Sequence, residues 1–262
     1  RHIEPPDFSG VNIEYWFKPQ TIEELAVIKS FIDDLEDLYA KEFFYACFSN
    51  TVRAVSGTRK GEFKLYRMPS EKWEQYRPNT LEVFDEKVTN GISGMGEFWS
   101  LLKNCKIGKS HVIEGDTRRL YTDTFPSKPR IREGSVNTIV TSPPYGDSHT
   151  TVAYGQFSRY SLLWLGYSKE RALAVDKESL GGRKKKESLN SETLDATLSG
   201  IRHPTRIWEV KSFFTDMNEC LGKLEMALAK GGHACFVLGN RTVNGISIPS
   251  DQILIELGHA LG

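Results

Sequence analysis

Hydrophobic residues recur at helical spacing near the start of the chain and again near its end. Over residues 211–230 and 249–261 this spacing predicts two helices. Another helix is predicted after Thr21, because Thr21 followed by Glu24 is typical of a capping box. The apolar face of that helix consists of Ile22, Leu25, Ile28, Phe31, Ile32, Leu35 and Leu38.

Short apolar segments in the second half predict β-strands. Residues 111–116 (HVIEGD) and 136–141 (VNTIVT) have strand-like composition. Residues 234–238 follow the glycine pair 231–232 and are continuously apolar, as in a buried parallel strand. Strands that alternate with helices predict an α/β fold, in which ligands bind beyond the carboxyl ends of the strands. These predicted ends carry Asp116, Ser142 to Tyr145, and Asn240.

Two further segments have a less regular pattern. Residues 80–89 have the spacing of a short helix, and the glycines of residues 90–96 predict that a loop follows it. Residues 176–198 are polar and contain a glycine pair followed by four basic residues, which predicts a mobile loop.

Length and composition limit the class of protein. A chain of 262 residues with 39% hydrophobic residues can bury the core of one large domain. No apolar run is long enough to span a membrane and no secretion signal opens the sequence, so we expect a cytoplasmic protein. The cysteines lie far apart without a histidine cluster, which argues against a metal site. They are Cys47, Cys105, Cys220 and Cys235.

Charge is balanced overall but unevenly placed. The 34 Lys and Arg equal the 34 Asp and Glu, so the chain as a whole does not attract nucleic acid. Residues 51–77 nevertheless hold seven Lys or Arg against three Glu, and residues 183–186 are all basic. A nucleic-acid partner would therefore be bound locally.

The sequence Ser142-Pro143-Pro144-Tyr145 follows a predicted strand and carries the most specific chemistry. Prolines at a strand exit are common in ordinary turns. Here, however, two prolines fix the backbone and leave carbonyl acceptors exposed, with a hydroxyl and an aromatic ring beside them. Such acceptors could hold an exocyclic amine of a base while that weak nucleophile attacks, and the ring could stack on a base that has left the duplex.

The segment 136–166 resembles the catalytic region of amino-directed DNA methyltransferases that use S-adenosylmethionine. Residues 142–145 match the (D/N/S)-P-P-(Y/F/W) signature of that family, and serine in the first place resembles its cytosine-N4 branch. Aspartate or asparagine is commoner in the adenine-N6 branch, which remains the alternative. The resemblance implies that the substrate is double-stranded DNA with a flipped target base. It also implies that the biological setting is a prokaryotic restriction-modification system.

The resemblance also implies roles for individual residues. Ser142 and the carbonyl of Pro143 would hold the amine, Pro144 would keep the backbone rigid and Tyr145 would stack on the base. Gly115, Asp116 and Ser142 would contact the cofactor. His149, near the motif, could line the base pocket. We also expect DNA contacts from Arg53, Arg59, Lys60, Lys64, Arg67, Arg183, Lys184 and Lys185.

The sequence departs from this family's pattern in two places. It lacks a strand followed by an F-x-G-x-G turn, which would hold the methionine part of the cofactor. Residues 91–96 are rich in glycine but follow no buried strand, so an ordinary loop is favoured there. The family's closing hairpin is also missing after Leu261. We therefore expect a chain incomplete at both ends, or one whose partner chain supplies the glycine-rich turn.

The resulting prediction is an α/β fold with a Rossmann-like methyltransferase sheet that lacks its first strands and final hairpin. Residues 1–110 would form a helical and basic region that acts as a lid or DNA-recognition element, and residues 111–262 the catalytic part. Residues 237–241 resemble the fifth strand of that sheet. A rival of another class is a DNA-binding or specificity subunit without catalysis.

Overall fold

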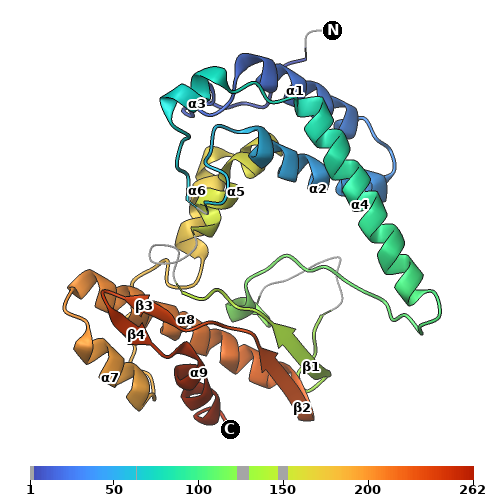
Figure 1. Cartoon of the computed structure of the whole chain (residues 1–262). Coiled ribbons are helices and arrows are strands. Elements are labelled where there is room, and N and C mark those ends of the chain that lie inside the picture. The colour runs from blue at the N-terminus through green and yellow to red at the C-terminus, as the bar shows by residue number, and fades with distance from the viewer. Residues whose placement is uncertain (1–2, 63, 123–129, 147–152) are drawn as a thin grey trace. The chain divides into compact units, whose positions relative to one another are not determined.

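The computed structural model describes residues 3–62, 64–122, 130–146 and 153–262. The chain forms two compact units, coloured along its length in Figure 1. The helical unit contains Arg1–Gly108 and Tyr154–Val175, and the mixed unit contains Lys109–Ala153 and Asp176–Gly262. Residues 154–175, which the sequence grouped with the catalytic region, therefore pack with the N-terminal helices.

The helical unit is built from six helices in its described residues. Figure 1 shows α5 and α6, which come from the second sequence segment of this unit, beside the N-terminal helices. The helices are α1 (Pro19–Asp33), α2 (Leu38–Val55), α3 (Ser70–Gln75), α4 (Thr80–Leu102), α5 (Tyr154–Trp164) and α6 (Lys169–Glu178), which ends in the mixed unit.

Helix α1 begins earlier than the sequence pattern predicted. Lys18 is its N-cap and Pro19 occupies the first turn, where a missing N–H costs nothing. Thr21 is buried inside the helix, so the predicted capping box is wrong. Glu24 instead accepts a hydrogen bond from the backbone N–H of Thr80 at 3.3 Å, and so supports the start of α4.

Helix α4 is much longer than predicted, since it continues through residues 90–96. Each glycine costs a helix only about 1 kcal/mol relative to alanine, and helix-forming residues follow. Gly91 also lies against α2: a Cβ there would approach Cε2 of Phe43 to 2.9 Å. The predicted loop is therefore wrong, and these glycines form no nucleotide-binding turn.

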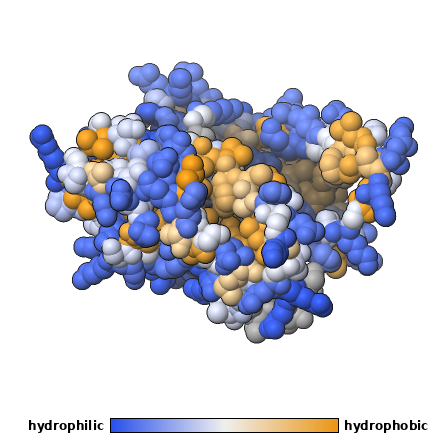
Figure 2. Space-filling model, turned by 90° about the horizontal axis from the view of Figure 1, so that it is seen from below, coloured by the Kyte–Doolittle hydropathy of each residue, from blue (hydrophilic) through white to orange (hydrophobic). Residues whose placement is uncertain are grey.

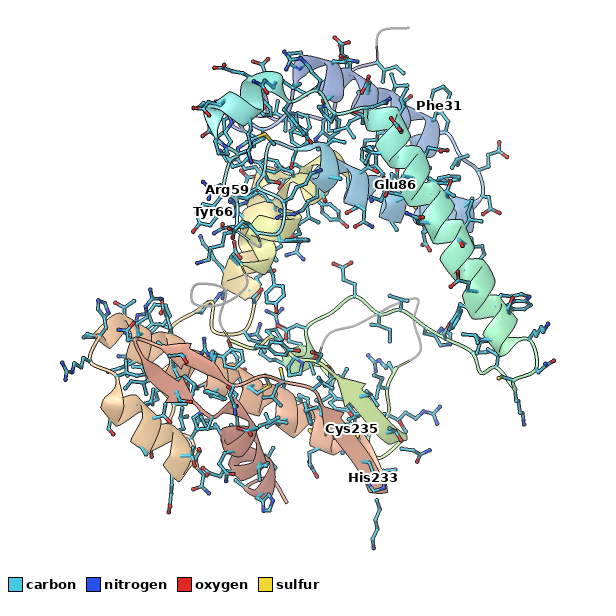
Figure 3. The ribbon with its side chains drawn as sticks, viewed as in Figure 1. Phe31, Arg59, Tyr66, Glu86, His233 and Cys235 are labelled. Atoms are coloured by element: carbon cyan, nitrogen blue, oxygen red, sulfur yellow. The ribbon has the colours of Figure 1, made fainter. Side chains whose placement is uncertain are left out.

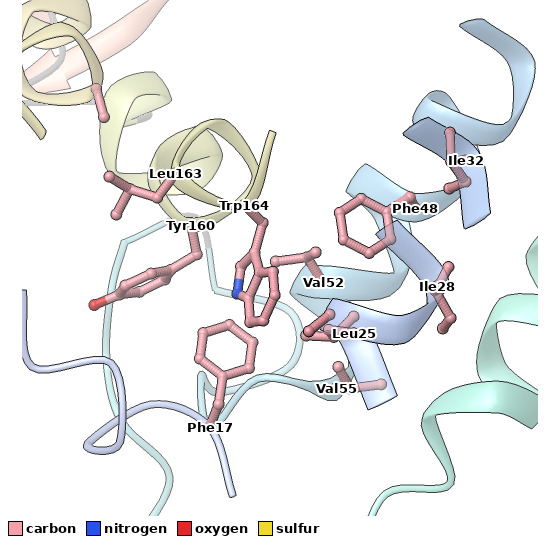
Figure 4. Close-up of a cluster of buried hydrophobic side chains, with 12 residues drawn as sticks. Phe17, Leu25, Ile28, Ile32, Phe48, Val52, Val55, Tyr160, Leu163 and Trp164 are labelled. Carbon is pink, nitrogen blue, oxygen red and sulfur yellow. The ribbon is translucent and has the colours of Figure 1, made fainter. Parts of the chain in front are cut away.

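The core of the helical unit is aromatic and joins both of its sequence segments. Trp164 of α5 is fully buried, and its ring lies 6.0 Å from that of Phe17 and 6.2 Å from that of Phe48. Figure 4 shows these rings facing one another beside the aliphatic residues of α1 and α2. Residues 154–175 thus belong to this unit because they complete its core.

The mixed unit contains two pairs of strands and three α-helices in its described residues. Strands β1 (Val136–Thr141) and β2 (Leu228–Phe236) pair in parallel, and β3 (Arg241–Val243) and β4 (Ile246–Ile248) in antiparallel. The helices are α7 (Glu192–Gly200), α8 (Pro204–Ala227) and α9 (Ser250–His259), with a 3-10 turn, η1 (Thr117–Arg119).

Four sequence expectations are corrected in this unit. Residues 111–116 form no strand, because no described segment pairs with them and Val112 is exposed. Helix α8 ends at Ala227 rather than Lys230, and the glycine pair produces an irregular register inside β2. Residues 237–241 are not one strand. Val237 still donates to the Thr141 carbonyl, but Arg241 begins a hairpin.

The fourth correction concerns residues 176–198, which are not a mobile loop. Their ends lie in α6 and α7, and the segment between them is anchored to α8 by hydrogen bonds described below. The polar composition of this segment reflects ion pairing rather than disorder.

The mixed unit packs its core around α8 but leaves hydrophobic residues exposed elsewhere. Phe213, Phe214 and Met217 of α8 are buried against α7, α9 and the β3–β4 hairpin. Val140 of β1 and Val237 after β2 are 73% and 60% exposed. Figure 2 shows hydrophobic side chains gathered on the face it presents. The parallel pair is compatible with an α/β fold, and the wider sheet remains a prediction.

Across the described part of the chain, every helix is too short or too polar to cross a membrane.

Candidate functional site

The Ser-Pro-Pro-Tyr motif lies at the carboxyl end of β1. The strand ends at Thr141, and the prolines that follow lack the N–H groups needed to continue its ladder. The hydroxyl oxygens of Ser142 and Tyr145 lie 3.2 Å apart, within hydrogen-bond distance. Both residues are exposed, and the Tyr145 ring is 43% accessible. The motif thus presents two hydroxyls and an aromatic face to solvent.

The parallel pairing of β1 with β2 brings a second strand end to the motif. Gly239 follows β2, and a Cβ built there would lie 3.9 Å from Cδ2 of Tyr145. Asn240 comes next, but its side chain accepts a hydrogen bond from the backbone N–H of Asp251 at 3.2 Å. Asn240 was expected at a strand end that carries chemistry, but its side chain supports the start of α9.

A pocket of about 470 Å³ lies beside Gly115 and Asp116. Its apolar wall includes Ile113, Leu120 and Ile131. The other lining residues are Thr117, Tyr121, Arg130, Arg132 and Glu133. The two predicted cofactor residues before β1 are thus part of a concave, mixed apolar and polar surface, although the expected strand before them is absent.

Asp116 is held by Arg118 within the pocket wall. Its carboxylate caps η1 by accepting from the backbone N–H of Arg118 at 3.0 Å. The guanidinium of Arg118 also donates to it through Nε at 2.9 Å and through Nη2 at 2.7 Å. Burial tends to raise the pKa of Asp116, but these hydrogen bonds and the positive charge lower it overall. Asp116 therefore stays ionised.

The same guanidinium contacts a second carboxylate, Asp216 of α8. Nη1 of Arg118 lies 2.8 Å from Oδ1 of Asp216, which is 1% exposed. Lys185 lies 2.6 Å from that oxygen and 2.5 Å from the carboxylate of Glu219. The backbone N–H of Gly181 donates to the other oxygen at 2.7 Å. One buried carboxylate thus joins η1, α8 and residues 179–191.

The predicted DNA-binding residues divide into exposed and internally held side chains. Arg53 donates to the Phe157 carbonyl at 3.3 Å and to the Glu62 carbonyl at 2.5 Å, and Arg67 stacks 3.9 Å from the Tyr15 ring centre. The ammonium of Lys185 forms ion pairs with Asp216 and Glu219. Burial lowers the pKa of Arg53. These three side chains are therefore engaged within the protein.

The other basic residues lie in two separate segments. Arg59, Lys60 and Lys64 belong to a turn closed by pairing of Thr58 with Arg67. Figure 3 shows Arg59 beside Tyr66, and their guanidinium and ring centre are 6.0 Å apart. Arg183 and Lys184 are exposed in residues 179–191 of the mixed unit.

Sequence reasoning missed Arg118 and Asp216. A signal for Asp216 was present, because it interrupts the apolar face formed by Phe213, Phe214 and Met217. A carboxylate in such a position is buried and needs a cationic partner. The described residues contain no group of three or more potential metal ligands. His149 lies outside the described residues.

Comparison with known proteins now bears on this site. The chain is 37% identical over 266 residues to the type II methyltransferase M.MvaI of Kocuria varians. The chain is similar to a methyltransferase. The alignment covers 96% of this chain and 57% of M.MvaI, so the chain spans little more than half the length of that relative. No family model and no solved structure matches the chain.

Proposed function

We propose that this chain is part of a DNA methyltransferase that transfers a methyl group from S-adenosylmethionine to cytosine N4 in double-stranded DNA. The observation that carries the proposal is the 37% identity to M.MvaI over 96% of this chain, and it is supported by the exposed Ser142 and Tyr145 at the end of β1. By the same similarity, its setting is a restriction-modification system.

The chemistry of the motif suits an exocyclic amine. If Ser142 donates its proton to Tyr145 across their 3.2 Å contact, its lone pairs are free to accept from the amine. The Pro143 carbonyl offers a second acceptor. Two acceptors favour the amine geometry in which the nitrogen lone pair can attack the methyl carbon. Ser142 and the Pro143 carbonyl would thus hold the amine while its nitrogen takes up the methyl group that S-adenosylmethionine would supply, and the proton that the amine gives up would pass to solvent.

Tyr145 supplies the complementary face for the base. Its ring is partly exposed and lies over backbone near Gly239, where a side chain is absent. A base that has left the duplex can stack on such a ring, which recovers part of the free energy lost on unstacking.

The pocket at Asp116 fits the adenosine part of S-adenosylmethionine. Ile113, Leu120 and Ile131 provide apolar surface for a flat ring, and an ionised Asp116 can accept a hydrogen bond from an amino or hydroxyl group. Within the described residues the buried hydroxyl of Tyr121 has no hydrogen-bond partner. When bound, the cofactor supplies the electrophilic methyl group. Ser142 would contact it from the motif.

DNA would be held by basic residues that are at least partly exposed. Arg59, Lys60 and the half-buried Lys64 of the helical unit, and Arg183 and Lys184 of the mixed unit, are the proposed phosphate contacts. The remaining predicted residues, Arg53, Arg67 and Lys185, would act by supporting these segments. A partner chain that completes the cofactor site also remains part of the proposal.

Nucleoside analysis of methylated DNA tests this function. Purified protein is incubated with duplex DNA and S-adenosylmethionine, and the DNA is digested to nucleosides for mass spectrometry. We expect N4-methylcytosine. N6-methyladenine alone would support the adenine-N6 alternative, and no methylation even when the glycine-rich turn is supplied would support a non-catalytic DNA-binding subunit.

Variants of the motif then test its role. Ser142→Ala should reduce kcat by about 100-fold, since removal of one hydrogen-bonding group that acts in the transition state costs about that much. Ser135→Ala, at the other end of β1, is the matched control and should retain activity. Equal kcat for Ser142→Ala and wild type would contradict the proposed role.

A further inference from the structure

The pocket carboxylate and the basic segment of the mixed unit share one ionic network. Residues 179–191, termed here the basic loop, connect α6 to α7 and carry exposed Arg183 and Lys184. Asp116 belongs to the pocket wall. These two regions are far apart in sequence, yet Arg118 and Asp216 join them through direct contacts.

The guanidinium of Arg118 contacts three elements at once. Nε and Nη2 bind Asp116, Nη1 pairs with Asp216, and Nη2 also donates to the Glu178 carbonyl at 2.6 Å, where α6 ends and the basic loop begins. These contacts raise the pKa of Arg118 above its usual range, chiefly through the hydrogen bonds to Asp116. Its charge is therefore permanent.

Asp216 fixes the basic loop at two further points. Its carboxylate accepts from the Gly181 backbone N–H and pairs with Lys185, whose own backbone N–H donates to the Ser212 hydroxyl at 2.8 Å. Asp216 is almost fully buried. Since a buried carboxylate cannot lose its partners cheaply, a shift of Arg118 must be accompanied by a shift of the loop.

We propose that Arg118 is a positioning residue that couples ligand binding at Asp116 to DNA binding by the basic loop. The proposal rests on the proposed function, because it takes the pocket ligand to be S-adenosylmethionine and the polyanion to be DNA. A ligand bound against Asp116 stabilises one arrangement of Arg118, which in turn fixes the loop. By linkage, DNA bound to the loop must strengthen cofactor binding by the same factor.

Arg118 is suited to this role in a way that lysine is not. Its planar fork holds two carboxylates and a carbonyl at once, whereas a lysine ammonium is a single point of charge on a flexible stem. Arg118→Lys therefore keeps the positive charge but cannot contact both carboxylates and the carbonyl at once. Arg119, the exposed neighbour in η1, offers a matched control of the same residue type.

Calorimetry with S-adenosylhomocysteine, without and with a duplex oligonucleotide, tests the proposal. In the wild-type protein we expect the duplex to lower the Kd of S-adenosylhomocysteine about fivefold or more. Arg118→Lys should raise the Kd without DNA about tenfold, as expected for loss of charge-assisted hydrogen bonds, and should abolish the effect of DNA. Arg119→Lys, which likewise keeps the positive charge, should resemble wild type without DNA and with it.

Lys185→Met separates coupling from general structural damage. It removes the ion pair between the loop and Asp216 but leaves the hydrogen bond from the Gly181 N–H and the Asp116–Arg118 contacts intact. We therefore expect nearly wild-type affinity without DNA and a reduced effect of DNA. A merely structural role of the network would instead weaken S-adenosylhomocysteine binding in both variants alike.

The possible failures are distinguishable. If the wild-type protein binds no S-adenosylhomocysteine, the proposed function fails and the coupling fails with it. If wild type binds S-adenosylhomocysteine and Arg118→Lys binds it with the same Kd and the same response to DNA, the role of Arg118 alone is overturned. Wild-type binding that DNA does not change overturns the coupling.

Discussion

Each unit has an apolar core, but the mixed unit also buries an ionic network. Trp164 of the helical unit is fully buried among aromatic rings, whereas Asp216 of the mixed unit is almost as buried and is bound by two cations. Apolar packing depends on volume and shape. An ionic network depends on which charge is present at each position. The same degree of burial therefore makes the two units sensitive to different substitutions.

Removal of the Trp164 ring should have the largest effect. Trp164→Ala leaves a cavity in the aromatic core and should lower the free energy of unfolding by about 4 kcal/mol. Urea denaturation followed by circular dichroism measures this loss, and Trp164→Phe should recover part of it. A cost below about 1 kcal/mol would mean that residues 154–175 are not needed to complete the core.

Neutralising Asp216 should have the next largest effect. Asp216→Asn keeps the shape of the side chain but leaves Arg118 and Lys185 without their shared counter-charge, at a cost of about 3 kcal/mol. Asp195→Asn, at an exposed position of α7, is the control and should be nearly silent. If the two variants unfold at the same urea concentration, the contrast between the units breaks down.

The glycines of α4 give a smaller and more local test. Gly94→Ala should stabilise the protein by about 0.5–1 kcal/mol, because it lies in a helix and a Cβ there meets open space. Gly91→Ala should gain less, because its Cβ would approach the Phe43 ring to 2.9 Å. Thermal unfolding of the two variants measures the difference, and equal Tm values would contradict the close packing of α4 on α2.

The smallest expected effect concerns pH and Glu256. Hydrogen bonds from Ser191, then Thr193, lower the pKa of Glu256 from 4.5 to about 2. A carboxyl whose pKa is lowered by folding stabilises the protein above its unfolded pKa, and this contribution is lost as the pH falls towards the folded pKa.

Glu256→Gln should therefore be less stable than wild type at pH 7, and the difference should shrink between about pH 4.5 and pH 2. Urea denaturation across that range measures it. Glu225→Gln, an exposed substitution in α8, should show no such trend. A difference that stays constant with pH would show that the Glu256 charge does not matter.

Strong periodicity made part of this fold predictable. The helices near residues 19–33, 204–227 and 250–259 follow from runs of apolar residues that must be buried, and the strand that precedes Ser142 follows from its β-branched residues. The local sequence pattern was less informative where tertiary contacts determine the secondary structure. The glycines of α4 suggested a loop, but a helix that packs on α2 tolerates them.

The candidate site was predictable to a similar degree. The motif was found because prolines, a hydroxyl and an aromatic residue stand together in sequence. The ion pair between Arg118 and Asp216 was not predicted, because a contact between residues 98 positions apart leaves no periodic signal. Composition also does not reveal which cations are already paired, as Lys185 is with Asp216 and Glu219, and its contact with DNA stays a prediction.

The return of α5 to the helical unit also affects the order in which the protein folds during synthesis. The N-terminal helices emerge first, but their core stays open until Trp164 is available. By then residues 109–153, which carry the motif, have already left the ribosome. A domain normally folds as it is completed, so the helical unit cannot complete its core until a segment that follows the Ser-Pro-Pro-Tyr motif has emerged. Truncation after residue 150 should therefore yield an unstable N-terminal fragment rather than a folded helical domain.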